Sequence, residues 1–285
     1  MSFVKRQLNL QFSKQGNVLV SLAGLRCAAL ISNPGGNNGL AQLQLRVYGM
    51  TLEHMNQFSS TGANLIVNEG FDITVLAGSE GGTLGQIFSG GILSSYIDFS
   101  AVPEVAFVCV AQSGIFEKAS PSASNSWTGA QNAEDLIASL AQSIGYGFKN
   151  NGAHAVVQNQ NVYGSVIDQI KRIATAASLP FSIENKIIYL WANNGTKNDV
   201  VVDLNANTGL VGYPSYYPAG FIVKSEFNPN ITIGVTINLS SIIPKANGKF
   251  SIYSSTHELS TLTPDGAWFT NATLSIAGTP YVQVN

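Results

Sequence analysis

Strict alternation of apolar and polar residues marks three stretches near the start of the chain, at 8–12, 42–49 and 71–77. A period of two places every second side chain on the same face of a strand, so these stretches predict half-buried strands. The residues expected on the buried face are Leu8, Leu10, Phe12, Leu43, Leu45, Val47, Phe71, Ile73, Val75 and Ala77. Residues 103–114 are apolar on both faces and predict a central strand.

The pattern changes to a helical period after residues 120–129, which are small, polar and aperiodic. Asn132 with Asp135 three residues later is typical of a helix N-terminus, and Gly145 is suited to the C-terminal cap. The residues predicted to face the core are Leu136, Ile137, Leu140 and Ile144. These signals predict one amphipathic helix between the two caps.

A second helix is predicted from Ser165, again with an aspartate three residues later, to a point before Pro180. Its expected core residues are Val166, Ile167, Ile170, Ile173 and Ala177. Residues 181–191 then read as two short apolar runs around the polar residues 184–186. They predict a β-hairpin that turns at those residues.

The last third of the chain returns to the period of a strand. Residues 231–239 alternate strictly and predict one strand with Ile231, Ile233, Val235, Ile237 and Leu239 on the same face. Residues 249–255 predict a further strand that carries Phe250 and Ile252 and ends near His257. Proline and glycine signals between these runs are spaced as in a small barrel or sandwich.

The segment GLVGYP, residues 209–214, raises the question of a phosphate-binding loop. Such a loop needs a following helix N-terminus, whereas strand patterns follow here. Gly209 and Gly212 are therefore expected to adopt positive φ where the chain enters the last set of strands, and Pro214 is expected to end the incoming strand.

These elements predict an α+β fold that is mostly β. Two small β-barrel domains, residues 1–118 and 199–285, are expected to flank a segment with two helices and a β-hairpin, residues 132–198. The polar stretch 119–131 is the expected linker.

Composition changes this picture by pointing to assembly. Hydrophobic residues make up 45% of the chain and charged residues only 11%, with a net charge of −2. A surface so poor in charge must be covered by neutral polar side chains or by partners. The chain has no basic run suited to nucleic acid and no apolar run suited to a signal peptide or membrane helix. We therefore expect synthesis in the cytoplasm.

Candidate chemistry is sparse. No nucleophile elbow or Walker loop occurs, and the glycine-rich segment 78–85 predicts a hairpin loop. His54, His154 and His257 lie far apart in the sequence without metal-ligand spacing; His257 with Glu258 could form an acid/base pair, or bond locally at a strand end. We expect no catalytic, metal-binding or cofactor-binding residue.

Cysteines and aromatic residues leave simple alternatives. Cys27 and Cys109 lie in apolar runs and are expected to be inert core thiols. The aromatic residues Trp127, Trp191, Trp268, Tyr216 and Tyr217 could stack on sugars from exposed loops or act as buried anchors at contacts.

Four segments in order, residues 85–114, 133–152, 163–191 and 208–259, resemble the baseplate hub proteins of tailed bacteriophages. The first resembles the family's strand pair that closes its first barrel, and the second resembles its first helix and the short strand after it. The third resembles its helix and hairpin with a terminal tryptophan, and the fourth resembles its second barrel. The likeness extends from about residue 24 to residue 270.

The resemblance implies a homotrimer whose two barrels per chain present six similar surfaces to the hexameric tail tube, while the helical segment faces the central spike. It further implies a structural protein of the virion baseplate, with wedge or other tail proteins as neighbours. From charge and hydropathy we also expect no nucleic-acid site and no membrane segment. No lysozyme-like or peptidase-like segment is present, so we expect no enzyme activity. The alternatives are a carbohydrate- or receptor-binding module and, less favoured, a hydrolase built from dispersed carboxylates.

Overall fold

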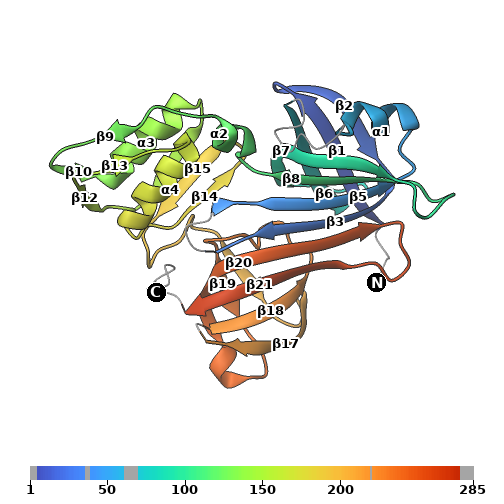
Figure 1. Cartoon of the computed structure of the whole chain (residues 1–285). Coiled ribbons are helices and arrows are strands. Elements are labelled where there is room, and N and C mark those ends of the chain that lie inside the picture. The colour runs from blue at the N-terminus through green and yellow to red at the C-terminus, as the bar shows by residue number, and fades with distance from the viewer. Residues whose placement is uncertain (1–4, 36–38, 61–69, 219, 277–285) are drawn as a thin grey trace. The chain divides into compact units, whose positions relative to one another are not determined.

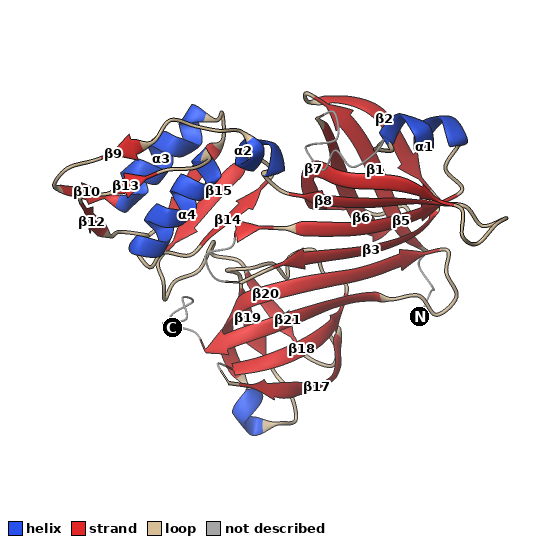
Figure 2. Ribbon diagram, in the orientation of Figure 1, coloured by secondary structure: helices blue, strands red, loops and turns tan. Residues whose placement is uncertain are grey.

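The computed structural model describes residues 5–35, 39–60, 70–218 and 220–276, and it is mostly β with a minority of helix. Figure 2 shows this balance. Contacts between Cα atoms divide the chain into two compact units. Unit 1 comprises Met1–Ser32, Ala41–Phe116 and His257–Phe269, and unit 2 comprises Asn33–Leu40, Glu117–Thr256 and Thr270–Asn285. The α+β, mostly β class is confirmed.

Unit 1 is built on one antiparallel sheet (Figure 1). Its strands are β1 (Arg6–Lys14), β2 (Asn17–Ala23), β3 (Arg26–Asn33), β5 (Gln42–Tyr48), β6 (Phe71–Ser79), β7 (Gly85–Asp98), β8 (Ala106–Gln112) and the end of β20 (Gly248–Thr261). Their order is β20-β3-β5-β8-β7-β6-β1-β2. Helix α1 (Leu52–Phe58) follows β5, and helix α2 (Ile115–Ala119) follows β8.

The core of unit 1 follows the alternation of its sequence. All ten residues expected on the buried faces of the first strands are buried. Phe12 of β1 stacks on Phe58 of α1 with ring centres 4.4 Å apart, and Phe71 of β6 meets Phe58 edge to face. β8 lies between β5 and β7, as expected for the central strand. Residues 80–84 connect β6 to its antiparallel partner β7, which confirms the hairpin loop.

The helical part of unit 2 confirms both predicted helices. Helix α3 (Ala133–Ser143) begins after Asn132, whose side-chain amide donates to the Asp135 carboxylate at 2.9 Å. Helix α4 (Val166–Ala176) begins at a capping box formed by Ser165 and Asp168. The two helices share one apolar core. Leu136 and Ile137 of α3 and Ile170 and Ile173 of α4 are buried in it.

Short strands complete this part of unit 2. They are β4 (Gly39–Leu40), β9 (Asn125–Ser126), β10 (Ala130–Asn132), β11 (Gly147–Asn151), β12 (Val156–Gln158), β13 (Asn161–Val162), β14 (Phe181–Glu184) and β15 (Ile187–Trp191). β14 and β15 form the expected hairpin, and its turn residues Asn185 and Lys186 have φ of 54° and 59°. Both values suit a two-residue turn with left-handed residues.

The C-terminal strands of unit 2 are β16 (Val201–Leu204), β17 (Leu210–Tyr217), β18 (Gly220–Glu226), β19 (Thr236–Leu239), β21 (Trp268–Ile276) and the start of β20. A 3-10 turn, Pro244–Ala246, precedes β20. The prediction of one strand over 231–239 is wrong in part: only Thr236–Leu239 is strand, because Gly234 turns the chain with φ of 80°. The five apolar residues of this segment are nevertheless all buried.

Two further boundaries differ from the sequence expectation. β20 continues past His257 to Thr261, so this histidine lies inside the strand. β17 continues through Pro214 to Tyr217, because its pairing with β18 is irregular between Val211 and Ser215 and its outer side is a sheet edge in the described strand order. Gly209 and Gly212 do adopt positive φ, of 104° and 71°. The expected glycine conformation is confirmed, and the expected end of the strand is wrong.

The division into domains 1–118, 132–198 and 199–285 with a linker at 119–131 stays a prediction. β9 and the first residues of β10 lie in the predicted linker, and β20 and β21 each contribute residues to both units. No helix in the described parts of the chain is long and apolar enough to cross a membrane.

Candidate interaction surface

The three histidines are in unrelated surroundings. His54 lies on α1, and His154 is exposed, with its Nδ1 2.8 Å from Oε1 of Glu134. Burial raises the pKa of the Glu134 carboxyl, but hydrogen bonds from His154 and from backbone N–H groups outweigh this and leave the pKa lowered. Within the described residues, no group of three or more His, Cys, Asp or Glu side chains could hold a metal ion.

His257 and Glu258 do not form an acid/base pair. They are consecutive residues inside β20, and consecutive side chains of a strand point to opposite faces. His257 is 1% exposed, and burial lowers its pKa to about 4, whereas Glu258 is exposed on the other face. The pair hypothesis rested on a strand end that the structure does not have.

Both cysteines are buried free thiols in unit 1. Burial raises the pKa of Cys27 and of Cys109 to about 12. Because the thiolate is the reactive form, neither sulfur is a nucleophile near neutral pH. The expectation of inert core thiols is confirmed.

The aromatic candidates separate into buried anchors and exposed rings. Trp191 is 0% exposed, and Trp127 is half-buried against the core of the helices. The Arg6 guanidinium lies 5.7 Å from the centre of the Trp268 ring. Tyr216 is 80% exposed on β17 and is the one predicted sugar-stacking residue whose ring is mostly open to solvent. Because Trp191 is fully buried, it cannot stack on a ligand unless the residues around it unfold.

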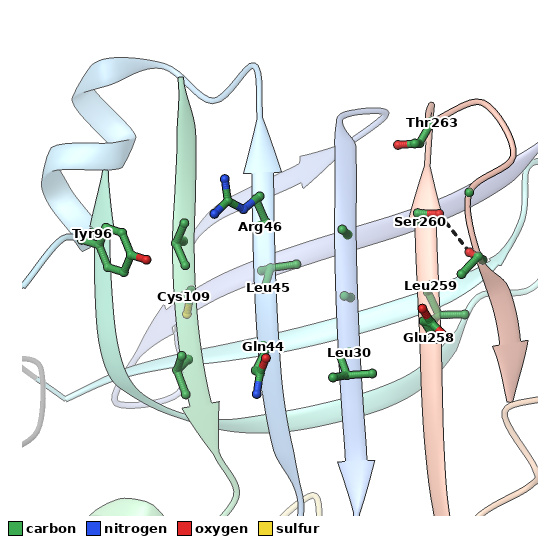
Figure 3. Close-up of a pocket in the computed structure, with 16 residues that line it drawn as sticks. Leu30, Gln44, Leu45, Arg46, Tyr96, Cys109, Glu258, Leu259, Ser260 and Thr263 are labelled. Atoms are coloured by element: carbon green, nitrogen blue, oxygen red, sulfur yellow. Dashed lines mark hydrogen bonds between the residues drawn. The ribbon is translucent and has the colours of Figure 1, made fainter. Parts of the chain in front are cut away.

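The outer face of the sheet is a coherent surface feature of unit 1. It consists of Ala28, Leu30, Gln44, Arg46, Tyr96, Val108, Val110, Glu258 and Ser260, and we call it the outer sheet face. These residues lie on β7, β8, β5, β3 and β20. Figure 3 labels Leu30, Gln44, Arg46, Tyr96, Glu258 and Ser260 among them. A shallow hollow of about 690 Å³ lies over them.

Strand register arranges the outer sheet face in rows. Ala28, Arg46, Val108 and Tyr96 are opposite one another across four strands, and Leu30, Gln44, Val110 and Ser94 form the next row. Each row thus combines apolar and polar side chains. The alternation of Gln44 and Arg46 could be read from the sequence, but β8 reads as apolar on both faces and conceals that Val108 and Val110 are half-exposed.

Two ion pairs lie on or beside these rows. Arg46 donates to Asp98 at 2.9 Å, and Arg26 donates to both oxygens of Glu104, at 2.8 and 3.3 Å. Hydrogen bonds from Ser100, together with Arg46, lower the pKa of Asp98, and Arg26 lowers that of Glu104. A face of this kind, half apolar and with Arg46 paired to Asp98, is suited to contact with another protein.

Comparison with known proteins places the chain among tail components. A family model described as Baseplate hub gp41 matches residues 42–268. A search of curated protein sequences finds no match.

Solved structures with the same fold also come from tails and related machines. A tail protein from Neisseria meningitidis MC58 is 8% identical, with a TM-score of 0.65, and the match covers 97% of this chain and 98% of that one. A type VI secretion component, c3393 of E. coli, is 9% identical with a TM-score of 0.61 over 96% and 79% of the two chains. The 43 kDa tail protein of prophage MuSo2 from Shewanella oneidensis is 8% identical with a TM-score of 0.58 over 94% and 97%.

Proposed function

We propose, because the chain belongs to the Baseplate hub gp41 family, that three copies form the hub that joins a phage tail tube to its central spike. In this proposal the trimer adapts the sixfold symmetry of the tube to the threefold symmetry of the spike. The chain is made in the host cytoplasm and acts mechanically in the baseplate, without catalysis, and other baseplate proteins surround it.

The observation that carries the proposal is the extent of the family match. Residues 42–268 include strands of both units and both long helices, so the match extends over most of the fold rather than over one motif. The low charge content supports a role in assembly, because surfaces that pack against other subunits avoid unpaired charge.

The two-barrel organisation is part of this proposal. In unit 1, Arg6 of β1 donates to the carbonyl of Gly266, which lies in the connection between β20 and β21. β1 and β20 lie near opposite ends of the strand order in this unit. This bond supports a sheet that curls toward closure, as a small barrel requires.

The test is the mass and shape of the purified chain. Light scattering coupled to size exclusion should give three times the chain mass of 30.1 kDa, and negative-stain images should show a three-lobed ring. A monodisperse monomer at high concentration would contradict the proposal. The same preparation should not hydrolyse peptidoglycan.

A second function has one observation in its favour. Tyr213 and Tyr216 on β17 are 68% and 80% exposed, and exposed aromatic rings stack on sugars or receptor side chains. For a carbohydrate-binding module, glycan-array signal should disappear in Tyr216→Ala and persist in Tyr96→Ala, a control on an exposed ring of unit 1. Absence of signal from the unmodified chain would leave the hub as the better account.

A further inference from the structure

Lys197 is a lysine that the fold of unit 2 buries. Its exposed fraction is 4%, although lysine side chains are rarely buried unless they are paired. Its ammonium Nζ donates to Oε1 of Glu184 at 2.6 Å and to the Thr232 hydroxyl at 2.9 Å. The same Glu184 oxygen accepts from the Ser182 hydroxyl at 3.2 Å. These four side chains form one polar network.

Lys197 lies on the connection between two separate apolar cores of unit 2. The first core is built from α3, α4 and the β14–β15 hairpin, and its last buried residue in the sequence is Leu190. The second is built from the C-terminal strands, and its first buried residue is Val202. The chain passes from the first core to the second through residues 192–200, between β15 and β16. A residue on this connection is placed to control movement of the two cores relative to each other.

Lys197 forms hydrogen bonds with elements on both sides of the connection. On the side of the first core, its ammonium bonds to Glu184 at the end of β14, and its carbonyl accepts from the Asn151 amide of β11. On the side of the second core, its ammonium bonds to Thr232, and its N–H donates to the Gly234 carbonyl at 2.7 Å. A single residue therefore makes two bonds to each side.

A small apolar cluster lies beside this network. Trp191 and Ile233 are buried in it, and Tyr189 and Tyr253 pack against them. The Lys197 ammonium lies 5.5 Å from the centre of the Tyr189 ring, within the range of a cation–π contact. The Glu184 side chain, in contrast, is 32% exposed. The cation is thus removed from water, while water still reaches the carboxylate that pairs with it.

A buried ion pair joins two cores in a way that apolar contacts do not. Taking both charges out of water costs free energy that offsets most of their attraction, so apolar side chains of similar volume would stabilise the junction at least as well. The ion pair instead fixes one geometry, because the ammonium must meet the Glu184 carboxylate and the Thr232 hydroxyl together. Its small net stabilisation also allows the contact to open. These properties suit a contact that sets position.

We propose that Lys197 is a latch. When it is closed, it holds the helical core of unit 2 in one orientation against the C-terminal strands. When it is open, residues 192–200 act as a hinge between the two cores. The latch is independent of the proposed function, because it requires neither a trimer nor a tail. In a protein that acts mechanically, it determines whether the two cores move as one body.

Hydrogen exchange measured by mass spectrometry on the full chain tests the latch. Lys197→Met retains a long unbranched side chain and removes the ammonium. We expect amides in peptides covering 192–200 to exchange about tenfold faster, while amides of α3 and α4 exchange as before. The matched control is Lys149→Met, because the Lys149 ammonium lies 5.4 Å from the same Tyr189 ring but its residue is exposed on β11. The control should exchange like the unmodified chain.

A milder variant keeps the test decisive if Lys197→Met does not fold. Glu184→Gln retains an oxygen that accepts from Lys197 and removes the negative charge. We expect exchange at 192–200 to become about threefold faster in this variant. If exchange instead rises by the same factor at 192–200, α3 and α4 in both variants, the ion pair only stabilises unit 2 as a whole, and the latch is overturned.

Distances between the two cores test the hinge directly. Val156 of β12 and Ile242, just before the 3-10 turn, are 64% and 77% exposed. Both native cysteines are buried with a raised pKa of about 12, so Val156→Cys with Ile242→Cys gives two selective sites for spin labels. An excess of unlabelled chain restricts the measurement to distances within one copy. Electron–electron double resonance should give a narrow distance distribution, which broadens when Lys197→Met is added.

Two results of the distance measurement would overturn the inference. Equal, narrow distributions with and without the Lys197 ammonium would mean that the cores form one rigid body without a latch. A broad distribution in the chain that retains Lys197 would mean that the latch does not hold the cores. Neither result bears on the hub, whose test is the mass and shape of the assembled chain.

Discussion

Two stretches of the C-terminal strands, residues 231–239 and 248–261, show how differently a similar pattern can fold. The first alternates without a break, yet only its last four residues, Thr236–Leu239, form a strand. The second loses its apolar alternation after Ile252, yet it forms one strand of 14 residues. The two elements pair with each other, with Thr236 opposite Ser251. Alternation therefore indicates burial here more reliably than it indicates strand length.

The causes lie in single residues. In the first stretch, Gly234 takes φ of 80° and its carbonyl accepts from the Lys197 N–H at 2.7 Å, so the chain turns before the strand begins. In the second, Ser255, His257, Leu259 and Thr261 are all buried. These buried positions are one residue out of phase with Phe250 and Ile252, and three of the four are polar. The Thr261 hydroxyl, for example, bonds to the backbone at Leu25 and Cys27.

The largest effect is expected at the turn. A Cβ on Gly234 would lie 2.7 Å from Cβ of Lys197 and 3.0 Å from Cζ2 of Trp191, in a backbone conformation that a branched residue avoids. Gly234→Val should therefore lower the free energy of unfolding by about 4 kcal/mol, from strain and overpacking together. Urea titration followed by tryptophan fluorescence measures this. A loss below about 1 kcal/mol would mean that the turn is not required and that residues 231–235 can be extended.

Helices, hairpin and N-terminal strands could be predicted because their signals are local. A capping box at Ser165, two turn residues after Glu184 and alternation in β1 each depend on near neighbours in the sequence. The length of β20 depends on residues more than 200 positions away, such as Cys27, and sequence pattern does not report such contacts. The same limit applies to the outer sheet face, whose rows exist only once four strands are in register.

Functional residues were harder to anticipate than the fold for a related reason. The sequence drew attention to Glu258 and Trp191 by residue type, but one faces away from its expected partner and the other is fully buried. The outer sheet face includes Leu30, Val108 and Val110, apolar residues of a type that sequence reasoning assigns to the core. Its signal is exposure, and exposure is a property of the folded chain.

A middle-sized effect is expected from the buried histidine of β20. Burial lowers the pKa of His257 to about 4, below its usual 6.5, so the unfolded chain takes up this proton at higher pH than the folded chain. The histidine's contribution is complete above pH 6.5, and stability falls as pH is lowered from 6.5 toward 4, by up to about 3 kcal/mol. Urea titrations at pH 7, 6 and 5 should show this slope.

The variant His257→Gln tests the assignment of that slope. Glutamine cannot be protonated in this range, so the dependence between pH 7 and 5 should become shallower even if the variant is less stable at every pH. An unchanged slope would mean that other groups carry it. In that case the burial of His257 would not lower the free energy of unfolding in acid.

The smallest effect is expected at the start of β20. A side chain added there tests backbone conformation with almost no change in packing. Gly248 has φ of 131°, and a Cβ there would meet nothing within 4 Å. Gly248→Val should cost about 2 kcal/mol, the strain of the backbone alone. The difference between this loss and that of Gly234→Val measures the packing of the turn against Lys197 and Trp191. If the two substitutions cost the same, that packing contributes nothing, and backbone conformation alone decides where the two strands begin.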